Sequence, residues 1–254
     1  MTPLLNLEDL SVAFGGVAAV NRVSFSLEEE SVLALVGPNG AGKTTLLNAI
    51  SGLVKIQSGR ITYAGGRQLH SMPAAARAGL GISRTFQQSR LFKGLKVLDQ
   101  LLCGGYSPVR YRTVASIVRI PDMIHAEKEL VRQAFHLLDE LGLPDAANLD
   151  LESLPGPDRR LVDLGRALMS NPRLLLLDEI AAGMTEKDKE RVVQIVQSRY
   201  AAGGLAVIVI EHDLQFVRRL ADRAVVLASG RVIATGPTNE VLAQPDVLSA
   251  YVGG

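Results

Sequence analysis

Short, continuously apolar runs in both halves of the chain predict the buried strands of a parallel sheet. Four such runs cover residues 32–36, 174–177, 205–210 and 224–227. Strands that are covered by helices on both faces have this character. Residues 5–14 and 23–27 instead alternate apolar and polar side chains, and residues 61–63 continue that pattern, which predicts half-buried antiparallel strands. We therefore predict an α/β fold with an antiparallel N-terminal part.

The middle of the chain has few strand-like runs and several helical patterns. The strongest helical pattern covers residues 122–141 and ends at Gly142. Its apolar side chains recur at three- and four-residue spacing, as on the buried face of a helix. They are Leu130, Ala134, Leu137, Leu138 and Leu141. Residues 104–108, which read GGYSP, favour a loop.

These patterns predict one domain over residues 1–254, interrupted by a helical insertion. Residues 1–92 and 169–254 are expected to form the α/β core. Residues 93–168 are expected to form the inserted α-helical subdomain.

A glycine-rich segment joins the first apolar run to a helical pattern. Residues 37–45 read GPNGAGKTT and fit the phosphate-loop pattern G-x-x-x-x-G-K-[ST], in the strand–loop–helix context that this motif requires. The glycines let backbone N–H groups point inward, and the helix N-terminus adds the positive end of its dipole. We expect Lys43 to reach the β- and γ-phosphates of a nucleotide and the Thr44 hydroxyl to bind Mg²⁺. The predicted nucleotide-binding residues of this loop are Gly37, Pro38, Asn39, Gly40, Ala41, Gly42, Lys43, Thr44 and Thr45.

Two carboxylates, Asp178 and Glu179, follow the apolar run 174–177. The ends of strands in parallel sheets are where ligands bind. We expect Asp178 to hold Mg²⁺, directly or through water, and Glu179 to act as the general base that polarises the attacking water. Alone, an Asp-Glu pair after a strand is equally an ordinary helix N-terminus, and the phosphate loop decides for the functional interpretation.

The composition excludes several other classes of protein. Basic and acidic residues balance at 27 to 26, so no overall positive charge for nucleic acid is present, and we predict no nucleic-acid partner. Cys103 is the sole cysteine, which rules out an intramolecular disulfide and indicates a reducing compartment. The N-terminus carries Glu8 and Asp9 and no basic leader, so no signal peptide is expected. The longest apolar runs are far below the roughly 18 residues of a membrane helix.

The order of the motifs points to a family. Gln87 lies between the phosphate loop and the helical region, and His212 follows a later apolar run. With Phe14, this order resembles the nucleotide-binding subunit of ABC transporters over nearly the whole chain, and it is most similar to the ATP-binding subunits of branched-chain amino acid importers. The segments that carry the resemblance are residues 14–20, 37–45, 84–87, 90–92, 141–143 and 236–251.

The resemblance implies a RecA-like P-loop NTPase fold, with ATP and Mg²⁺ as ligands. It implies that Phe14 stacks on adenine, that Gln87 touches Mg²⁺ and the attacking water, and that His212 bonds the γ-phosphate. The catalytic residues are then Lys43, Gln87, Glu179 and His212. The helical subdomain would contact membrane permease subunits, which places the chain in the cytoplasm on the inner face of the membrane. Branched-chain amino acids are the expected solute, with urea, amides and other small polar solutes open.

The signature loop departs from the family pattern. The family reads about LSGGQ where residues 154–158 read LPGPD. Pro155 has neither a hydroxyl nor an N–H, Pro157 removes another N–H, and Asp158 adds a negative charge. Proline and aspartate suit the first turn of a helix, so the helix is expected to form. Losing two or more hydrogen bonds to a phosphate, each worth roughly 1.5–3 kcal/mol, would weaken capping of the partner's ATP by about 10²- to 10⁴-fold.

Two smaller departures lie further along the chain. Ile180 stands where the family usually has proline, and residues 182–185 read AGMT in a loop that commonly ends in Leu-Asn or Leu-Asp.

These departures predict an asymmetric partnership. The chain's own phosphate loop, Glu179 and His212 look intact and need a signature loop from another subunit. We therefore expect a heterodimer with a second ABC ATPase subunit and weak ATPase activity as a homodimer. Two alternatives stay open at this point: a hydrolysis-poor regulatory or structural subunit, and a soluble ABC ATPase of translation or DNA repair.

Overall fold

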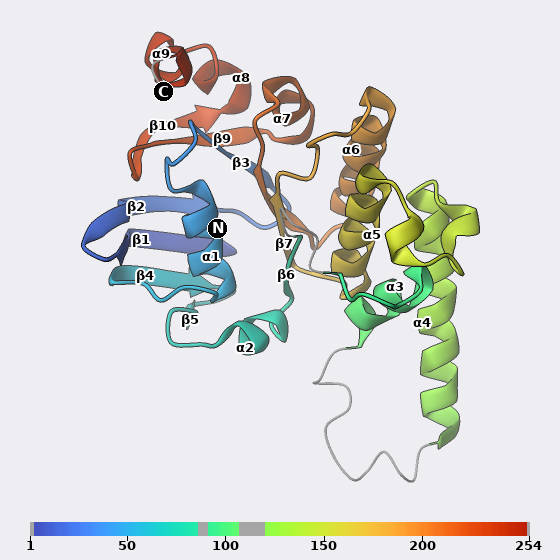
Figure 1. Ribbon diagram of the computed structural model, residues 1–254. Helices are drawn as coiled ribbons and strands as arrows, with labels where there is room; N and C mark the ends of the chain where they lie inside the picture. Colours follow the sequence, from blue (N-terminus) through green and yellow to red (C-terminus); the bar gives the residue numbers. More distant parts are fainter. Residues whose placement is uncertain (1–2, 86–90, 107–119, 253–254) are drawn as a thin grey trace.

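The computed structural model describes residues 3–85, 91–106 and 120–252 and contains two sheets flanked by helices (Figure 1). The smaller sheet is antiparallel, in the order β2-β1-β4-β5. Its strands are β1 (Leu5–Phe14), β2 (Val17–Leu27), β4 (Ser58–Tyr63) and β5 (Arg67–Gln68). The predicted antiparallel N-terminal part is thus confirmed.

A bulge adjusts the alternation of β1. Leu5 and Leu7 are buried, and Leu10 and Val12 are buried after a step of three residues rather than two. The pairing register with β2 shifts between Leu7 and Leu10, and Asp9 there has a φ of 45°. A bulge inserts one extra residue into a strand, so both apolar pairs face the core.

The larger sheet has the order β10-β9-β3-β8-β7-β6, with parallel pairing except between β9 and β10. Its strands are β3 (Val32–Val36), β6 (Ile82–Arg84), β7 (Leu174–Asp178), β8 (Ala206–Ile210), β9 (Arg223–Ala228) and β10 (Arg231–Pro237). Every residue of β3, β7 and β8 is buried, which confirms the strands predicted from apolar runs. The edge strand β6 was not predicted, because three residues are too few to show a pattern, and only Ile82 among them is buried.

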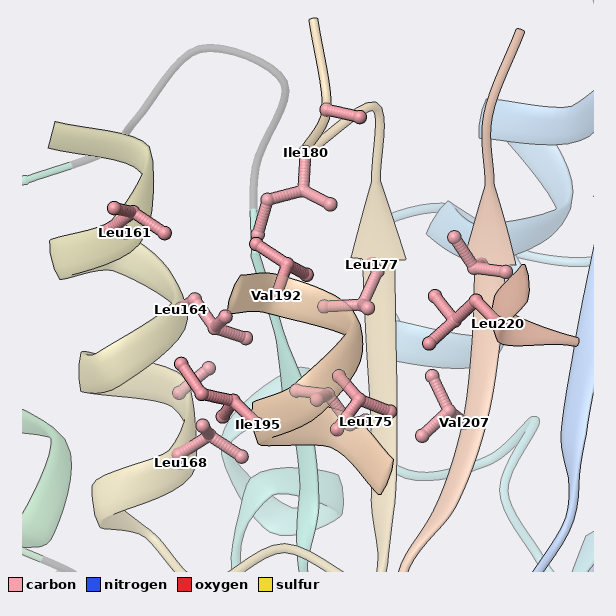
Figure 2. Packing of buried hydrophobic residues seen from close by; sticks show 14 of the residues in the cluster. Leu161, Leu164, Leu168, Leu175, Leu177, Ile180, Val192, Ile195, Val207 and Leu220 are labelled. Carbon is pink, nitrogen blue, oxygen red and sulfur yellow. The ribbon is translucent and has the colours of Figure 1, made fainter. Parts of the chain in front are cut away.

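The larger sheet divides two apolar layers. Leu174 and Leu176 face a cluster that includes α1 and the antiparallel sheet, whereas Leu175 and Leu177 face the helices on the other side. Figure 2 shows the second layer, in which Leu164 and its neighbours on α5 and α6 pack against β7 and β8. Successive side chains of a strand point to opposite faces, so one apolar strand serves both layers.

The helices include a long one at the edge of the molecule, α4, which confirms the helix predicted over residues 122–141 (Figure 1). The helices are α1 (Lys43–Ser51), α2 (Ala74–Ala78), α3 (Val97–Gly105), α4 (Ile120–Glu140), α5 (Gly156–Met169), α6 (Glu186–Ala201), α7 (Leu214–Leu220), α8 (Thr238–Val241) and α9 (Pro245–Val252), with 3-10 turns at Pro144–Ala146 and Leu151–Ser153. Within the described ranges, no helix combines the length and the apolar character needed to cross a membrane.

The loop predicted at residues 104–108 is wrong in its first part. Gly104 and Gly105 belong to the last turn of α3. A Cβ atom at Gly104 would lie 1.9 Å from the carbonyl oxygen of Arg166, and one at Gly105 would lie 2.3 Å from Cδ1 of Leu130. The glycines therefore permit close packing of α3 against α5 and α4, which the GGYSP pattern did not indicate.

Candidate nucleotide-binding site

The phosphate loop connects β3 to α1 along a backbone path that favours glycine at three positions. Gly37, Gly40 and Gly42 have φ angles of 145°, 77° and 98°. A Cβ atom at Gly37 would lie 2.1 Å from the carbonyl oxygen of Leu227, and one at Gly42 would lie 2.3 Å from that of Ala19. The loop is therefore held between β9 and β2.

The first turn of α1 presents its N–H groups at this loop. The residue before the helix, Gly42, contributes no side-chain cap. The N–H groups of a first helical turn lack intrahelical partners and carry the positive end of the dipole. Thr44 and Thr45, half-buried in this turn, follow Lys43 at its start. Asn39 and Gly40 are exposed at the tip of the loop. The loop and the first turn of α1 together form a site that can bind an anion.

Lys43 crosses the loop and is buried. Its Nζ donates to the carbonyl oxygens of Gly37 at 2.7 Å and Pro38 at 2.9 Å. Burial lowers the pKa of Lys43, while the carboxylates of Glu179 and Asp178 act in the opposite direction. The structure thus brings the predicted lysine and both predicted carboxylates together.

Asp178 ends β7 and is 3% exposed. Its Oδ2 accepts from Nη2 of Arg84 at 2.8 Å, and its backbone N–H donates to Oγ1 of Thr85 at 3.2 Å. Its Oδ1 is buried without a hydrogen-bond partner. A buried carboxylate oxygen without a partner is costly, and it suits a hard cation or the water that such a cation carries. The residues present therefore fit Mg²⁺.

Glu179 and His212 meet where β7 and β8 end. Oε1 of Glu179 lies 3.1 Å from Nε2 of His212, and the backbone N–H of Glu179 donates to the carbonyl oxygen of Ile210 at 2.9 Å. Glu179 has a φ of 51°, a left-handed conformation that costs energy for a residue with a Cβ. Strained backbone held by neighbouring structure is found preferentially at functional sites.

Two further polar residues near this site were missed from the sequence. Glu211 is 3% exposed, and burial raises its pKa to about 7. Arg84 belongs to the segment 84–87 that carries the family resemblance, but the sequence indicates no role for it. The signal for Glu211 was its place directly after the apolar run 205–210, although the sequence could not show that its carboxyl group turns inward.

Of the two remaining predicted residues, the structure describes Phe14 alone. Phe14 ends β1 and is 52% exposed, on the hairpin whose second strand contacts the phosphate loop at Ala19. Gln87 falls outside the described residues, so its position is not placed.

Residues 154–158, where the family resemblance places the signature loop, lead into α5, and the helix forms as expected. The helix starts at Gly156, with Pro155 as a cap residue that makes no side-chain hydrogen bond. Asp158 lies in the first turn, and its pKa is raised by burial and by the carboxylate of Asp188, against the opposing charge of Arg191. The prolines thus leave the helix intact but offer no side-chain donor at its start.

Comparisons with known proteins agree with this geometry. The family model for "ABC transporter" matches residues 20–182. The branched-chain amino acid transport ATP-binding protein LivG of Salmonella typhimurium is 34% identical over 99% of this chain and 98% of its own length. BraF of Pseudomonas aeruginosa, with the corresponding description, is 33% identical over the same shares of the two chains.

Solved structures give the same result. A nucleotide-free ATP-binding cassette from an ABC transporter is similar with a TM-score of 0.85 and 31% identity, over 100% of both chains. An ATP-binding cassette in its ADP conformation is similar with a TM-score of 0.83 and 30% identity, also over 100% of both chains. The predicted P-loop NTPase fold is confirmed. The phosphate-loop geometry, the full-length relatives and the shared fold together show that this chain belongs to the ABC transporter family, as one of its ATP-binding cassettes.

Proposed function

We propose that this chain binds and hydrolyses ATP to energise an importer of branched-chain amino acids or similar small polar solutes. The observation that carries the proposal is the contact of 3.1 Å between Glu179 Oε1 and His212 Nε2, beside a buried Lys43. Relatives that are described as high-affinity branched-chain amino acid transport proteins support the solute class.

Glu179 would act as the general base. Its carboxylate takes a proton from water as the water oxygen bonds the γ-phosphorus of ATP and the bond to the bridging oxygen of ADP breaks. His212 contacts the same carboxylate and orients it. With ATP bound, an N–H of its ring would donate to the γ-phosphate. Lys43 neutralises charge on the β- and γ-phosphates. Mg²⁺ would be held by Thr44, Gln87 and Asp178, and it supplies charge stabilisation at the phosphate oxygens.

Glu179→Gln tests hydrolysis directly. The amide keeps the shape of the side chain and cannot accept the proton, so ATP turnover in the assembled transporter should fall by about 10²- to 10⁴-fold. The dissociation constant for ATP should stay within about threefold. The exposed Glu127→Gln on α4 is the matched control and should change neither quantity. Equal turnover in the Glu179 variant and the parent would remove the proposal.

The partner subunit is proposed to be a different ABC ATPase. Pro155 and Pro157 supply no N–H at the start of α5, and Asp158 supplies a negative charge, so a second copy of this chain would cap ATP weakly. Purified chain alone should turn over ATP far more slowly, per chain, than a mixture with its cognate partner. The triple variant Pro155→Ser, Pro157→Gly, Asp158→Gln should raise turnover of the chain alone. Equal turnover alone and in the mixture would contradict a heterodimer.

A groove between the core and the helical segment is the proposed permease site. It has a volume of about 700 Å³ and lies between α2 and β6 on one side and α3 and α5 on the other. Phe92 and Tyr106, exposed by 55% and 40%, line it together with Leu53. Apolar surface of this kind suits a protein partner.

Cys103 gives a direct test of that site, since it is exposed in the groove and is the sole cysteine of the sequence. A cross-linker on Cys103 should capture a permease subunit in the assembled transporter. Cross-links only to the second ATPase subunit would place the permease elsewhere.

The second candidate is a nucleotide-binding subunit that hydrolyses ATP poorly. The prolines and Asp158 at the start of α5 favour it. The two candidates differ in the Glu179→Gln result, because a hydrolysis-poor subunit would show no loss of turnover from that change.

A further inference from the structure

Arg84, at the end of β6, joins three elements of the nucleotide-binding site. Its Nη1 donates to Oδ1 of Asn48 at 2.7 Å and to Oγ of Ser51 at 2.9 Å, both on α1. Its Nη2 donates to Oδ2 of Asp178 at 2.8 Å. The side chain is 6% exposed and that of Asp178 is 2% exposed. One buried guanidinium therefore links β6, the helix of the phosphate loop and the strand that carries the carboxylate.

The contact with Arg84 makes the two carboxylate oxygens of Asp178 different from each other. Arg84 occupies Oδ2, while the backbone of Asp178 is held by Oγ1 of Thr85. A carboxylate fixed in this way cannot rotate freely, so Oδ1, which is buried without a hydrogen-bond partner, is the oxygen left to accept from a metal ion or its water. An outer partner that orients a ligand in this manner commonly changes metal affinity by 10- to 100-fold.

We propose that Arg84 is a positioning residue that orients Asp178 and thereby sets how strongly Mg²⁺ increases the affinity of this chain for ATP. The inference rests on the proposed function, because it takes Asp178 as a ligand of Mg²⁺ or of its water. It gives a role to a residue between the phosphate loop and the helical segment, and that role acts through Asp178.

The geometry requires arginine rather than lysine. The guanidinium is planar and has separate N–H donors for α1 and for Asp178, whereas a lysine ammonium is a single point charge. Arg84→Lys keeps the positive charge, but lysine cannot donate to α1 and to Asp178 at the same time. The effect of this variant therefore measures the orientation of Asp178 and not the loss of a charge.

The experiment compares ATP binding with Mg²⁺ and with EDTA, by calorimetry on the full chain. The ratio of the two dissociation constants is the gain from Mg²⁺. In Arg84→Lys, the gain should fall at least fivefold, while the affinity for metal-free ATP should change less than twofold. The exposed Arg60→Lys on β4 is the matched control and should leave both quantities unchanged.

A second variant keeps the test open if Arg84→Lys fails to fold. Asn48→Ala with Ser51→Ala removes the anchor on α1 and leaves the ion pair with Asp178, and it should reduce the gain from Mg²⁺ at least twofold. A full gain in folded Arg84→Lys, or an equal loss of affinity with and without Mg²⁺, would overturn the inference and leave the proposed function intact. Parent protein that gains nothing from Mg²⁺ would instead contradict the metal site of the proposed function, and the inference with it.

Discussion

Glu211 is expected to make this protein less stable as the pH rises, and one substitution can test this dependence. Its carboxyl group lies after β8, where Oε1 accepts the N–H of Ala181 at 2.6 Å. Burial raises its pKa from 4.5 to about 7, against the hydrogen bonds from the backbone of Ala181 and His212 and with the help of the carboxylates of Glu179 and Asp213. Between pH 4.5 and about 7, Glu211 therefore keeps its proton in the folded protein and loses it in the unfolded chain.

The sign and the magnitude follow from this difference. Because the folded pKa is the higher one, the contribution to the free energy of unfolding is fully present below pH 4.5 and is lost as the pH rises through about 7. Each pKa unit corresponds to about 1.4 kcal/mol, so the difference between 4.5 and about 7 costs the folded protein about 3 kcal/mol at a pH of about 8. At a pH of about 5, most of that cost has disappeared.

Glu211→Gln removes the titration and keeps an oxygen that accepts the N–H of Ala181. At a pH of about 8, the variant should be more stable than the parent by about 3 kcal/mol, which is a rise in melting temperature of roughly 6–12 °C for a chain of this size. The advantage should shrink to about 1 kcal/mol at a pH of about 5.

Urea unfolding of both proteins at a series of pH values measures this difference, with the exposed Glu127→Gln as the control for loss of one negative charge. A stability difference between Glu211→Gln and the parent that does not change with pH would refute the reasoning, because it would mean that Glu211 does not titrate between pH 4.5 and about 7.

Three further predictions concern the loop, the core and the hairpin. Gly37→Ala should destabilise the fold by more than about 3 kcal/mol in urea unfolding, because the new Cβ would lie 2.1 Å from a carbonyl oxygen, whereas Gly40→Ala, with open space around it, should cost only about 1–2 kcal/mol. Leu164→Ala in the fully buried layer of Figure 2 should cost about 2–5 kcal/mol by the same assay, and the exposed Leu248→Ala less than about 0.5 kcal/mol. Phe14→Ala should weaken calorimetric binding of ATP but not of inorganic tripolyphosphate, and equal weakening of both would exclude stacking on adenine.

The sequence predicted much of the fold because its signals are local. The runs 174–177 and 205–210 are apolar throughout, and the structure buries the strands that they form on both faces. The helix over residues 122–141 followed equally from its spacing. The edge strand β6 and the glycines at the end of α3 could not be predicted, since the first is too short to show a period and the second depend on the approach of α5.

The sequence by itself determined the phosphate loop, because a turn of glycines between a strand and a helix is specified by consecutive residues and binds an anion through its own backbone. It also placed Asp178, Glu179 and His212 at the ends of strands, although the roles given to them stay predictions. Only the tertiary structure decided which groups meet: Arg84 lies 94 residues from Asp178, and Glu211 lies 30 residues from the N–H that it accepts. Such pairings depend on the order of strands in the sheet and on the burial it imposes, and no local pattern of residues encodes either.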